Sequence, residues 1–434
     1  MVHLKGRTAR RTELKVLVVG SGAREHTLVW KIAQSKKVSQ VFAAPGNAGI
    51  GQTAVNLDVK ANDLPGLEKA VRDNRIDLIV VGPEDPLAAG IVDYFQERGV
   101  PIFGPTQKAA QLEASKVFSK ELMQKYGIPC AKSVSFSDFE AAREYVIKKG
   151  GAVWVKADGL AAGKGAVFAR TPKEAVEVLA SMMQSKVFGT AGTSVVVEDV
   201  LVGREMSAFV ITAGKAIVHV VPACDSKRVN DGDEGPNTGG MGCYSPPVFL
   251  TPALEEKVTE VVMRPVVNAM RTEGRPYQGV IYGGLMIDRG QPSVIEFNSR
   301  FGDPECQVIL PRLKSDLVDV LLAAVEGKLD SARPVWSDEA CVGVAVASGG
   351  YPGKYRTGLK ISGLGDVDKD ILVFHAATKA GAEPGEILTN GGRVLTVVAR
   401  GKTLEEAREK VYANVSRIHF EGCHYRKDIA LFKE

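Results

Sequence analysis

The first hundred residues alternate between short apolar runs and longer amphipathic stretches. The apolar runs have the length of buried strands and lie at 15–20, 38–43, 78–82 and 101–104. The stretches between them space their apolar residues as helices do, at 21–31, 64–74 and 86–98. Strands that alternate with helices predict a parallel α/β sheet, which we expect to end near Gly104-Pro105.

A helix is predicted over 109–126, and Gly127-Ile128-Pro129 interrupts the pattern there. Residues 130–188 then predict a small α/β unit. The remaining expected elements are strands at 152–156, 193–200, 205–211 and 216–222, helices at 172–184, 252–273 and 316–327, a hairpin turn at 288–291, and an α/β appendix in the last hundred or so residues. The stretch 225–245 has almost no apolar residues, and so long a loop inside a compact domain is usually functional or disordered.

The segment Val294–Gln307 reads VIEFNSRFGDPECQ, and its first half alternates strictly between apolar and polar residues. Its polar positions are Glu296, Asn298 and Arg300, and residues two apart in a strand point to the same face. Oxygen ligands of this kind suit Mg²⁺ bound together with nucleotide phosphates, and an arginine binds phosphate through two parallel hydrogen bonds. The alternative is an ordinary half-buried strand with a solvated polar face.

Composition limits the class of protein. The chain has 434 residues, 45% apolar and 24% charged, which is ordinary for a soluble globular protein of about three domains. The net charge of +4 equals the excess within residues 1–15, so it gives no support to nucleic-acid binding. We interpret 1–14 as a basic, flexible leader without the apolar segment of a secretory signal. The six cysteines and six histidines are dispersed, which favours reduced cytosolic thiols and gives no zinc-binding spacing.

A glycine-rich turn follows the first predicted strand. Gly20-Ser21-Gly22 places backbone N–H groups and a helix N-terminus where an anion can bind. Glu25 stands where a dinucleotide fingerprint has its third glycine. We favour a phosphate-binding turn, with a dinucleotide site and a purely structural turn as alternatives.

A second glycine-rich loop, Ala157–Gly165, follows the strand that ends at Lys156 and carries another lysine, Lys164. Glycines let backbone amides approach phosphate, and lysines add positive charge. The spacing is not that of a Walker A loop. We predict nucleotide binding here, against the alternative of a plain hairpin loop.

Two further segments give weaker signals. Val195–Glu205 is a predicted strand that runs into acidic residues. Its main chain could contact adenine, and Glu205 could contact a ribose. The alternative is an ordinary strand that ends in acidic residues. The polar stretch contains Asp225, Lys227 and Arg228 and continues into Pro236–Gly242. These residues could position a small polar substrate, and disorder is the alternative.

Taken together, these segments resemble the phosphoribosylamine–glycine ligase family, ATP-grasp enzymes of purine biosynthesis. The resemblance covers about residues 15 to 430 and rests on GSGAREH (20–26), APGNAG (44–49), VVGPEDPL (80–87), GPTQKAAQLEASK (104–116), VKADGLAAGKG (155–165), PNTGGMGCYSP (236–246), EFNSRFGDPECQ (296–307), ASGGYPGKY (347–355) and TNGGRVL (389–395). It implies an α/β ATP-grasp fold with an N-terminal parallel-sheet (Rossmann-like, pre-ATP-grasp) domain and a C-terminal α/β appendix. The implied units are the leader 1–14, a substrate-binding domain 15–113, an ATP-grasp domain 114–330 with a lid at about 127–192, and a C-terminal domain 331–434.

The resemblance also implies residue roles. The ATP-binding residues would be Lys116 and Lys156 at the phosphates, Gly163, Lys164 and Gly165 in a lid over them, Glu198 and Leu201 at the adenine, and Glu205 at the ribose. Catalysis would rest on Arg300 and Lys156, with Mg²⁺ or Mn²⁺ held by Glu296 and Asn298. The substrate-binding residues would be Gly22, Asn47, Glu84, Asp225 and Arg300.

The chain departs from the family pattern at two positions, Ala23 in place of a common glycine and Ser226 in place of a common histidine. In addition, Gly283–Ile287 lacks the second acidic residue that many ATP-grasp enzymes carry before the metal motif, so the ligands of any second metal are not predicted.

We therefore predict an ATP-dependent ligase. Glycine would attack the γ-phosphate of ATP to give glycyl phosphate, and 5-phosphoribosylamine would displace phosphate to give glycinamide ribonucleotide. The alternatives are an ATP-grasp ligase for another purine intermediate, a nucleotide sensor that has lost catalysis, and a dinucleotide oxidoreductase. We expect a cytoplasmic monomer whose only partners are these small molecules, with neither nucleic acid nor membrane.

Overall fold

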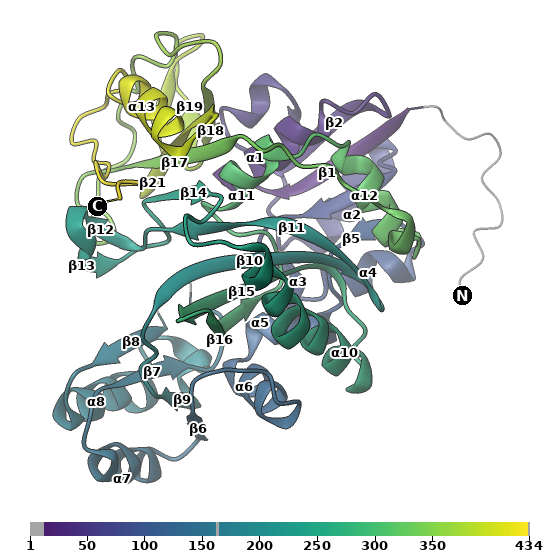
Figure 1. Ribbon diagram of the computed structural model, residues 1–434. Coiled ribbons are helices and arrows are strands. Elements are labelled where there is room, and N and C mark those ends of the chain that lie inside the picture. Colours follow the sequence, from purple (N-terminus) through teal and green to yellow (C-terminus); the bar gives the residue numbers. More distant parts are fainter. Residues whose placement is uncertain (1–12, 162–164, 433–434) are drawn as a thin grey trace.

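The computed structural model describes residues 13–161 and 165–432, and Figure 1 shows how its elements are arranged. Two of the predicted lid residues, Gly163 and Lys164, lie outside the described residues, as does nearly all of the leader 1–14. Within the described part, no helix is long and apolar enough to cross a membrane.

The N-terminal part is the predicted parallel sheet, with five strands in the order β3–β2–β1–β4–β5. Its strands are β1 (Leu14–Gly20), β2 (Val38–Pro45), β3 (Val55–Asn56), β4 (Leu78–Val81) and β5 (Ile102–Phe103). Its helices are α1 (Ala23–Ile32), α2 (Leu64–Asn74), α3 (Glu84–Ala88), α4 (Ile91–Glu97) and α5 (Gln107–Ala114). Helices cover both faces of such a sheet, which is why β1 and β4 are continuous apolar runs.

Two predicted helices are each divided in the structure. The helix expected over 86–98 is α3 and α4, because Gly90 takes a left-handed conformation with φ of 89°. The helix expected over 109–126 is α5 followed by α6 (Lys116–Lys125), with Ser115 in an extended conformation between them. The Ser115 side chain accepts a hydrogen bond from the Phe118 N–H and so caps α6.

A second, four-stranded sheet has the order β6–β9–β7–β8 and lies at the lower left of Figure 1 with α7 and α8. Its elements are β6 (Ser133–Phe136), α7 (Phe139–Lys149), β7 (Val153–Ala157), β8 (Ala166–Ala169), α8 (Pro172–Leu179), the π-helical η2 (Ala180–Gln184), the 3₁₀ turn η3 (Gly189–Gly192) and β9 (Val195–Glu198). This small unit places the end of β7 beside α6.

The third sheet has eight strands in the order β16–β15–β10–β11–β14–β17–β21–β18. Its strands are β10 (Arg204–Ala213), β11 (Ala216–Asp225), β14 (Gly242–Ser245), β15 (Gln278–Asp288), β16 (Gln291–Asn298), β17 (Ala340–Ala347), β18 (Leu372–His375) and β21 (Arg393–Gly401). The last three come from the C-terminal appendix and join the sheet through the β14–β17 pairing, so the appendix extends the sheet that contains the metal motif.

The remaining elements connect or cover these sheets. They are α9 (Pro252–Val258), the π-helical η5 (Thr259–Met263), α10 (Arg264–Thr272), α11 (Cys306–Ile309), α12 (Leu317–Val325), α13 (Leu404–Val415), the hairpin β19 (Thr378–Ala380) and β20 (Ile387–Thr389), and the 3₁₀ turns η1 (Ile50–Gln52), η6 (Leu310–Arg312) and η7 (Leu329–Ser331). The long helix predicted over 252–273 is therefore one run in which α9 and α10 flank a π-helical turn.

The prediction of a loop over 225–245 was wrong. The segment contains a hairpin of β12 (Arg228–Asn230) and β13 (Glu234–Asn237), with the turn η4 (Asp231–Asp233) between them, before β14 begins. Residues near the C-terminus hold this hairpin: Arg426 pairs with Asp233 at 2.7 Å, and the His424 ring contacts the Val229 carbonyl at 2.8 Å. Because these partners lie almost 200 residues away in sequence, local patterns gave no sign of the hairpin.

The predicted alternation along β16 holds only in part. The β15–β16 register shifts, so that Gly284 faces Glu296 while Leu285 faces Val294, and Ile295 forms a β-bulge. Glu296 and Asn298 then share one face, with the core residue Phe297 on the other. Arg300 lies beyond the end of β16, in a bend, so its predicted place in the same strand was wrong.

Candidate active site

A pocket lies where α6, β7 and β16 meet, and lysine side chains from two of these elements enter it. Lys116 and Lys120 are four residues apart on α6 and therefore on one face of the helix. Lys156 comes from β7. The Lys116 ammonium lies 3.2 Å from Glu296 Oε2.

Glu198, at the end of β9, pairs with two lysines in this pocket. Its Oε2 lies 2.8 Å from the Lys156 ammonium and its Oε1 lies 3.1 Å from the Lys120 ammonium. Both ammonium groups also approach the Ile295 carbonyl, at 3.2 and 3.3 Å, at the β-bulge of β16. All three side chains are almost completely buried. The bulge thus supplies a main-chain acceptor for two neighbouring cations.

The protonation equilibria of the pocket follow from this arrangement. Burial lowers the pKa of Lys156, Glu198 opposes that effect, and Lys120 lowers the pKa further. The neighbouring Lys116 is also buried, but Glu296 outweighs the burial and raises its pKa. Lys116 in turn lowers the pKa of Glu296 to about 2. Three lysine side chains converge on this pocket, and their ammonium groups suit a polyanion such as a triphosphate.

Glu296 and Asn298 lie side by side in register on one face of β16, opposite Gly284 and Tyr282 of β15. A carboxylate and a carboxamide oxygen are the ligands that Mg²⁺ and Mn²⁺ accept together with phosphate oxygens. Gly284 has no side chain to fill the space facing Glu296. The residues present therefore fit a divalent metal ion that also binds phosphate. A cluster of three or more His, Cys, Asp or Glu residues around one point is absent from the described part of the chain, in line with the missing second acid on β15.

Arg300 is held by carboxylates from two directions. Its Nε donates to Glu84 Oε2 at 3.0 Å, and its Nη2 lies 3.1 Å from Glu113 Oε1. Its Nη1 donates to the Phe301 carbonyl at 3.2 Å. Burial opposes ionisation of Glu84, but Arg300 and Arg24 outweigh it and bring the pKa of Glu84 to about 2.

Glu113, at the end of α5, joins Arg300 to the lysine pocket. Its Oε2 accepts the backbone N–H of Ser299 at 2.7 Å, and the residue also lines the pocket beside Lys116. One buried carboxylate therefore orients the segment that leaves β16 and the guanidinium that follows it.

The predicted substrate residues of the parallel-sheet domain are internally bonded. The Gly22 N–H donates to Glu25 Oε2 at 2.6 Å, which caps the start of α1. Asn47 donates to the carbonyl oxygens of Ser21 at 2.7 Å and His375 at 2.8 Å, and its own oxygen accepts from the turn that follows it. Asn47 thus ties the glycine turn to the C-terminal appendix.

A second group of charges forms where β11 leads into residues 225–242, which we call the polar loop. The Lys227 ammonium lies 3.0 Å from Asp225 Oδ1 and 2.6 Å from Glu205 Oε2. It therefore brings together a predicted substrate residue and the predicted ribose residue. Burial raises the pKa of Asp225 to about 6, and Lys227 opposes the rise. Lys227 also contributes to the low pKa of Glu296.

The residues predicted to bind adenine and those predicted to form the lid are less closely connected to each other. Leu201 is half-buried in the connection between β9 and β10, whereas the Glu198 side chain turns to the lysines. The Gly165 carbonyl accepts the Ala157 N–H at 2.8 Å and closes the base of the lid loop. Asp158, in the same loop, accepts from the Ser115 hydroxyl at 2.9 Å and the Val117 N–H at 3.2 Å. The loop is thereby anchored to the start of α6.

Sequence reasoning missed several residues of this region: Lys120, Asp158, Glu113 and Arg393. The spacing of Lys120 from Lys116 was a usable signal, because it repeats one helical turn after a predicted phosphate ligand. Glu113 and Arg393 lie in the quoted segments 104–116 and 389–395, but no local pattern gives them a role there, since their partners are distant in sequence.

The two departures from the family pattern lie in different surroundings. Ala23 is fully buried in the core of the parallel-sheet domain. Ser226 exchanges backbone hydrogen bonds with Gly242, at 2.9 Å, and Met241, at 2.7 Å, and so closes the base of the polar loop.

Comparison with known families adds independent findings. Three profiles described as Phosphoribosylglycinamide synthetase match the chain: the N domain over residues 14–113, the ATP-grasp (A) domain over 114–306 and the C domain over 341–431. Together they span most of the sequence.

Individual relatives agree. The trifunctional purine biosynthetic protein adenosine-3 of Gallus gallus is 50% identical over 420 residues, which cover 96% of this chain and 42% of that longer protein. The phosphoribosylamine–glycine ligase of Halalkalibacterium halodurans is 47% identical over 419 residues, 96% of either chain. The crystal structure of the phosphoribosylamine–glycine ligase from Thermotoga maritima superposes with a TM-score of 0.85 at 34% identity, covering 96% of this chain and 100% of that one. These similarities confirm the resemblance and the α/β ATP-grasp fold predicted from the sequence.

Proposed function

The chain belongs to the phosphoribosylglycinamide synthetase family, and we propose that it joins glycine to 5-phosphoribosylamine in an ATP-dependent reaction through the pocket around β16. The products would be glycinamide ribonucleotide, ADP and phosphate. The predicted enzyme class, a carbon–nitrogen ligase of purine biosynthesis, is confirmed by relatives that match over nearly their whole length.

One observation carries the assignment of the site: Glu113 lies both in the lysine pocket and against Arg300. A phosphoryl group held by the lysines and an acyl group held by the arginine would therefore be neighbours. That adjacency is what the transfer of a phosphoryl group to a carboxylate requires.

In the first step, a glycine carboxylate oxygen attacks the γ-phosphorus of ATP, the bond to ADP breaks, and glycyl phosphate forms. Lys116 and Lys156 neutralise charge on the phosphate oxygens, which is the main contribution a protein makes to phosphoryl transfer. Arg300 holds the glycine carboxylate. Since its three nitrogens are already bonded, we propose that the anion displaces Glu84, which is 27% exposed, and not the buried Glu113.

Glu296 and Asn298 would hold Mg²⁺ or Mn²⁺. When bound, such an ion neutralises phosphate oxygens and orients them. Around it, Lys116 exchanges its contact with Glu296 for a phosphate oxygen, and Asn298 keeps its place on β16 against the buried Phe297.

In the second step, the amine of 5-phosphoribosylamine attacks the acyl carbon, the bond from that carbon to the phosphate oxygen breaks, and the departing phosphate takes up the proton that the nitrogen loses. Asp225, with a pKa of about 6, is ionised at neutral pH and can accept a hydrogen bond from an amino group of either substrate. Gly22 and Asn47 would shape the side of the pocket formed by the parallel sheet. Closure of Ala157–Gly165 would exclude water from the acyl phosphate. We also propose that the protein works as a cytoplasmic monomer.

The test is an omission series with ATP, Mg²⁺, glycine and freshly generated 5-phosphoribosylamine. ADP release that requires both substrates, together with glycinamide ribonucleotide identified by mass, supports the proposal. ADP release without that product contradicts it and directs the search to another acid and amine. The same series separates this ligase from an inactive sensor, which binds ATP and releases no ADP.

A further inference from the structure

We propose that Arg393, from the C-terminal appendix, is a positioning residue of the ligase reaction, which holds the polar loop against the turn that follows Arg300. The inference rests on the proposed function, because it concerns where the substrates of that reaction are held. It also assigns the C-terminal appendix a role at the candidate active site.

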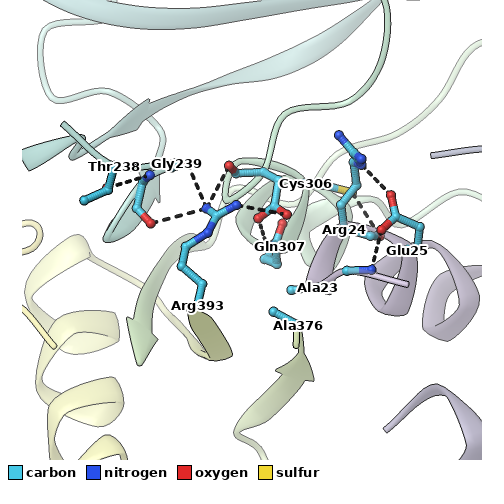
Figure 2. A network of polar contacts seen from close by, with 12 residues as sticks. Ala23, Arg24, Glu25, Thr238, Gly239, Cys306, Gln307, Ala376 and Arg393 are labelled. Carbon is cyan, nitrogen blue, oxygen red and sulfur yellow. Dashed lines mark hydrogen bonds and ion pairs between the residues drawn. The ribbon is translucent and has the colours of Figure 1, made fainter. Parts of the chain in front are cut away.

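The Arg393 guanidinium joins two separate segments (Figure 2). Its Nη1 donates to the Gly239 carbonyl at 2.7 Å, to the Gly240 carbonyl at 3.3 Å and to the Asp303 carbonyl at 3.0 Å. Its Nη2 lies 3.3 Å from the Asp303 carboxylate. Gly239 and Gly240 belong to the polar loop, whereas Asp303 follows Arg300 by three residues.

A second residue of the appendix holds the same glycine. The Gly239 N–H donates to the Tyr351 hydroxyl at 3.0 Å, so both backbone polar groups of Gly239 are bonded to the appendix. A Cβ atom on Gly239 would lie 3.1 Å from Arg393 Cζ. On Gly240, which has a φ of 114°, it would lie 2.4 Å from Pro304. The glycines allow the backbone to approach Arg393 and Pro304 this closely.

Hydrogen bonds within the polar loop connect Gly239 to the charged residues at the base of the loop. Thr238, next to Gly239, donates to the Lys227 carbonyl twice, through its N–H at 2.8 Å and its hydroxyl at 2.7 Å. Lys227 in turn pairs with Asp225 and Glu205. A continuous set of bonds therefore runs from Arg393 to a proposed substrate residue, 168 residues earlier in the chain.

The other partner of Arg393 is equally fixed. The Asp303 carboxylate accepts from Gln307 Nε2 at 2.7 Å as well as pairing with Arg393. A Cβ atom on Gly22 would lie 3.6 Å from Asp303 Oδ2, so the glycine turn of the parallel-sheet domain is next to this contact. Arg393 thus lies where three parts of the chain converge.

Only arginine matches these partners. Its planar fork reaches the loop carbonyls with one nitrogen and the carboxylate with another, whereas a lysine offers one point charge and would keep only part of the contacts. Methionine fills similar volume without any donor. R393K therefore removes part of these contacts, and R393M removes all of them.

The test compares steady-state kinetics of the full chain for wild type, R393K and R393M. The matched control is R356M, since Arg356 lies in the same appendix and, within the described residues, forms its ion pair with the exposed Glu421. We expect R393M to raise the KM for glycine and for 5-phosphoribosylamine about tenfold or more, and R393K less, because the ion pair with Asp303 and the hydrogen bonds to the loop carbonyls are lost. Binding of a non-hydrolysable ATP analogue should stay within about twofold, because the lysine pocket is untouched.

Each result of these measurements either supports or overturns the proposed role of Arg393. If R393M melts at a lower temperature but keeps both KM values, Arg393 is only structural and the proposal is overturned. If R393M does not fold, Y351F replaces it: it removes one bond to Gly239, and unchanged KM values in both Y351F and R393K overturn the proposal. A wild-type chain without ligase activity would refute the proposed function instead, which keeps the two failures distinct.

Discussion

Lys156 and Glu198 form a buried ion pair of 2.8 Å in which the carboxylate also serves a second lysine, Lys120. Two ammonium groups thus share one carboxylate and one main-chain carbonyl, at a β-bulge next to the proposed metal ligands. Burying like charges together is unfavourable unless a counter-charge arrives. We conclude that the converging lysines of the pocket are arranged for an anionic ligand.

The first prediction concerns Lys120. In K120M the pocket loses one positive charge and Glu198 is left to Lys156 alone, so we expect ATP to bind roughly tenfold more weakly. In the double variant K120M/E198Q the charge of Lys156 is free again, and part of the lost affinity should return. Calorimetric titration with a non-hydrolysable ATP analogue measures both.

A matched control is K125M, one turn further along α6, where the lysine is exposed and pairs with Glu273 at 2.7 Å. ATP affinity of this variant should match wild type. If the double variant binds ATP no better than K120M, the pairing of Glu198 with Lys156 does not limit ATP affinity.

The second prediction concerns Arg300. Its guanidinium bonds to Glu84 and Glu113 at once, and a lysine cannot reproduce two directed contacts. We expect R300K to lower kcat about a hundredfold or more, as loss of a preorganised donor does. Equilibrium ATP binding should change little, because the lysines are in place. Parallel loss of ATP binding would indicate instead that Arg300 organises the whole pocket.

The third prediction is a pH dependence of stability. The pKa of Glu84 is about 2 in the folded protein, below its ordinary value of 4.5, because Arg300 and Arg24 outweigh the burial. Its interactions therefore stabilise fully above about pH 4.5 and are lost as the pH falls toward 2. Urea denaturation should show a stability difference between wild type and E84Q that is constant from pH 5 to pH 7 and shrinks below that window. A difference independent of pH would place the effect in packing and not in the ion pairs.

The fourth prediction concerns the metal ligands. N298A should raise the Mg²⁺ concentration needed for half-maximal rate about tenfold or more, since one of two protein ligands is lost. Excess chelator should stop wild-type turnover, and Mg²⁺ or Mn²⁺ should restore it. S293A alters the same strand away from the site and should leave the metal dependence unchanged. A metal dependence of N298A equal to that of wild type would exclude Asn298 as a ligand.

The sequence predicted the regular parts of the fold because their patterns are local. The runs that became β1 and β4 are buried on both faces, and α2 covers the residues 64–74 expected for it. The breaks at Gly90 and Ser115 were missed, since a single backbone conformation there decides whether one helix or two form. The hairpin β12–β13 was missed because Arg426, far along the chain, holds it.

The candidate site likewise contains residues that the sequence predicted and residues that only the tertiary structure reveals. Lys116, Lys156, Glu198 and Glu296 were among the predicted residues and line one pocket, and Asn298 lies beside Glu296 on β16. The alternation around Arg300 led to the wrong strand placement, because β16 ends at Asn298 and Arg300 lies in the bend that follows, where a two-residue period no longer applies. Glu113 and Arg393 stand in two of the quoted motifs, 104–116 and 389–395, but only the tertiary structure shows which residues they contact.

The most direct test of the central claim follows the glycine carboxylate oxygen. The enzyme is supplied with ATP, Mg²⁺, 5-phosphoribosylamine and glycine in which both carboxylate oxygens are the heavy isotope, and the released phosphate is analysed by mass spectrometry. Reaction through glycyl phosphate predicts one heavy oxygen in each phosphate released, because the bond to the acyl carbon breaks when the amine attacks. Formation of glycinamide ribonucleotide with unlabelled phosphate would contradict that account.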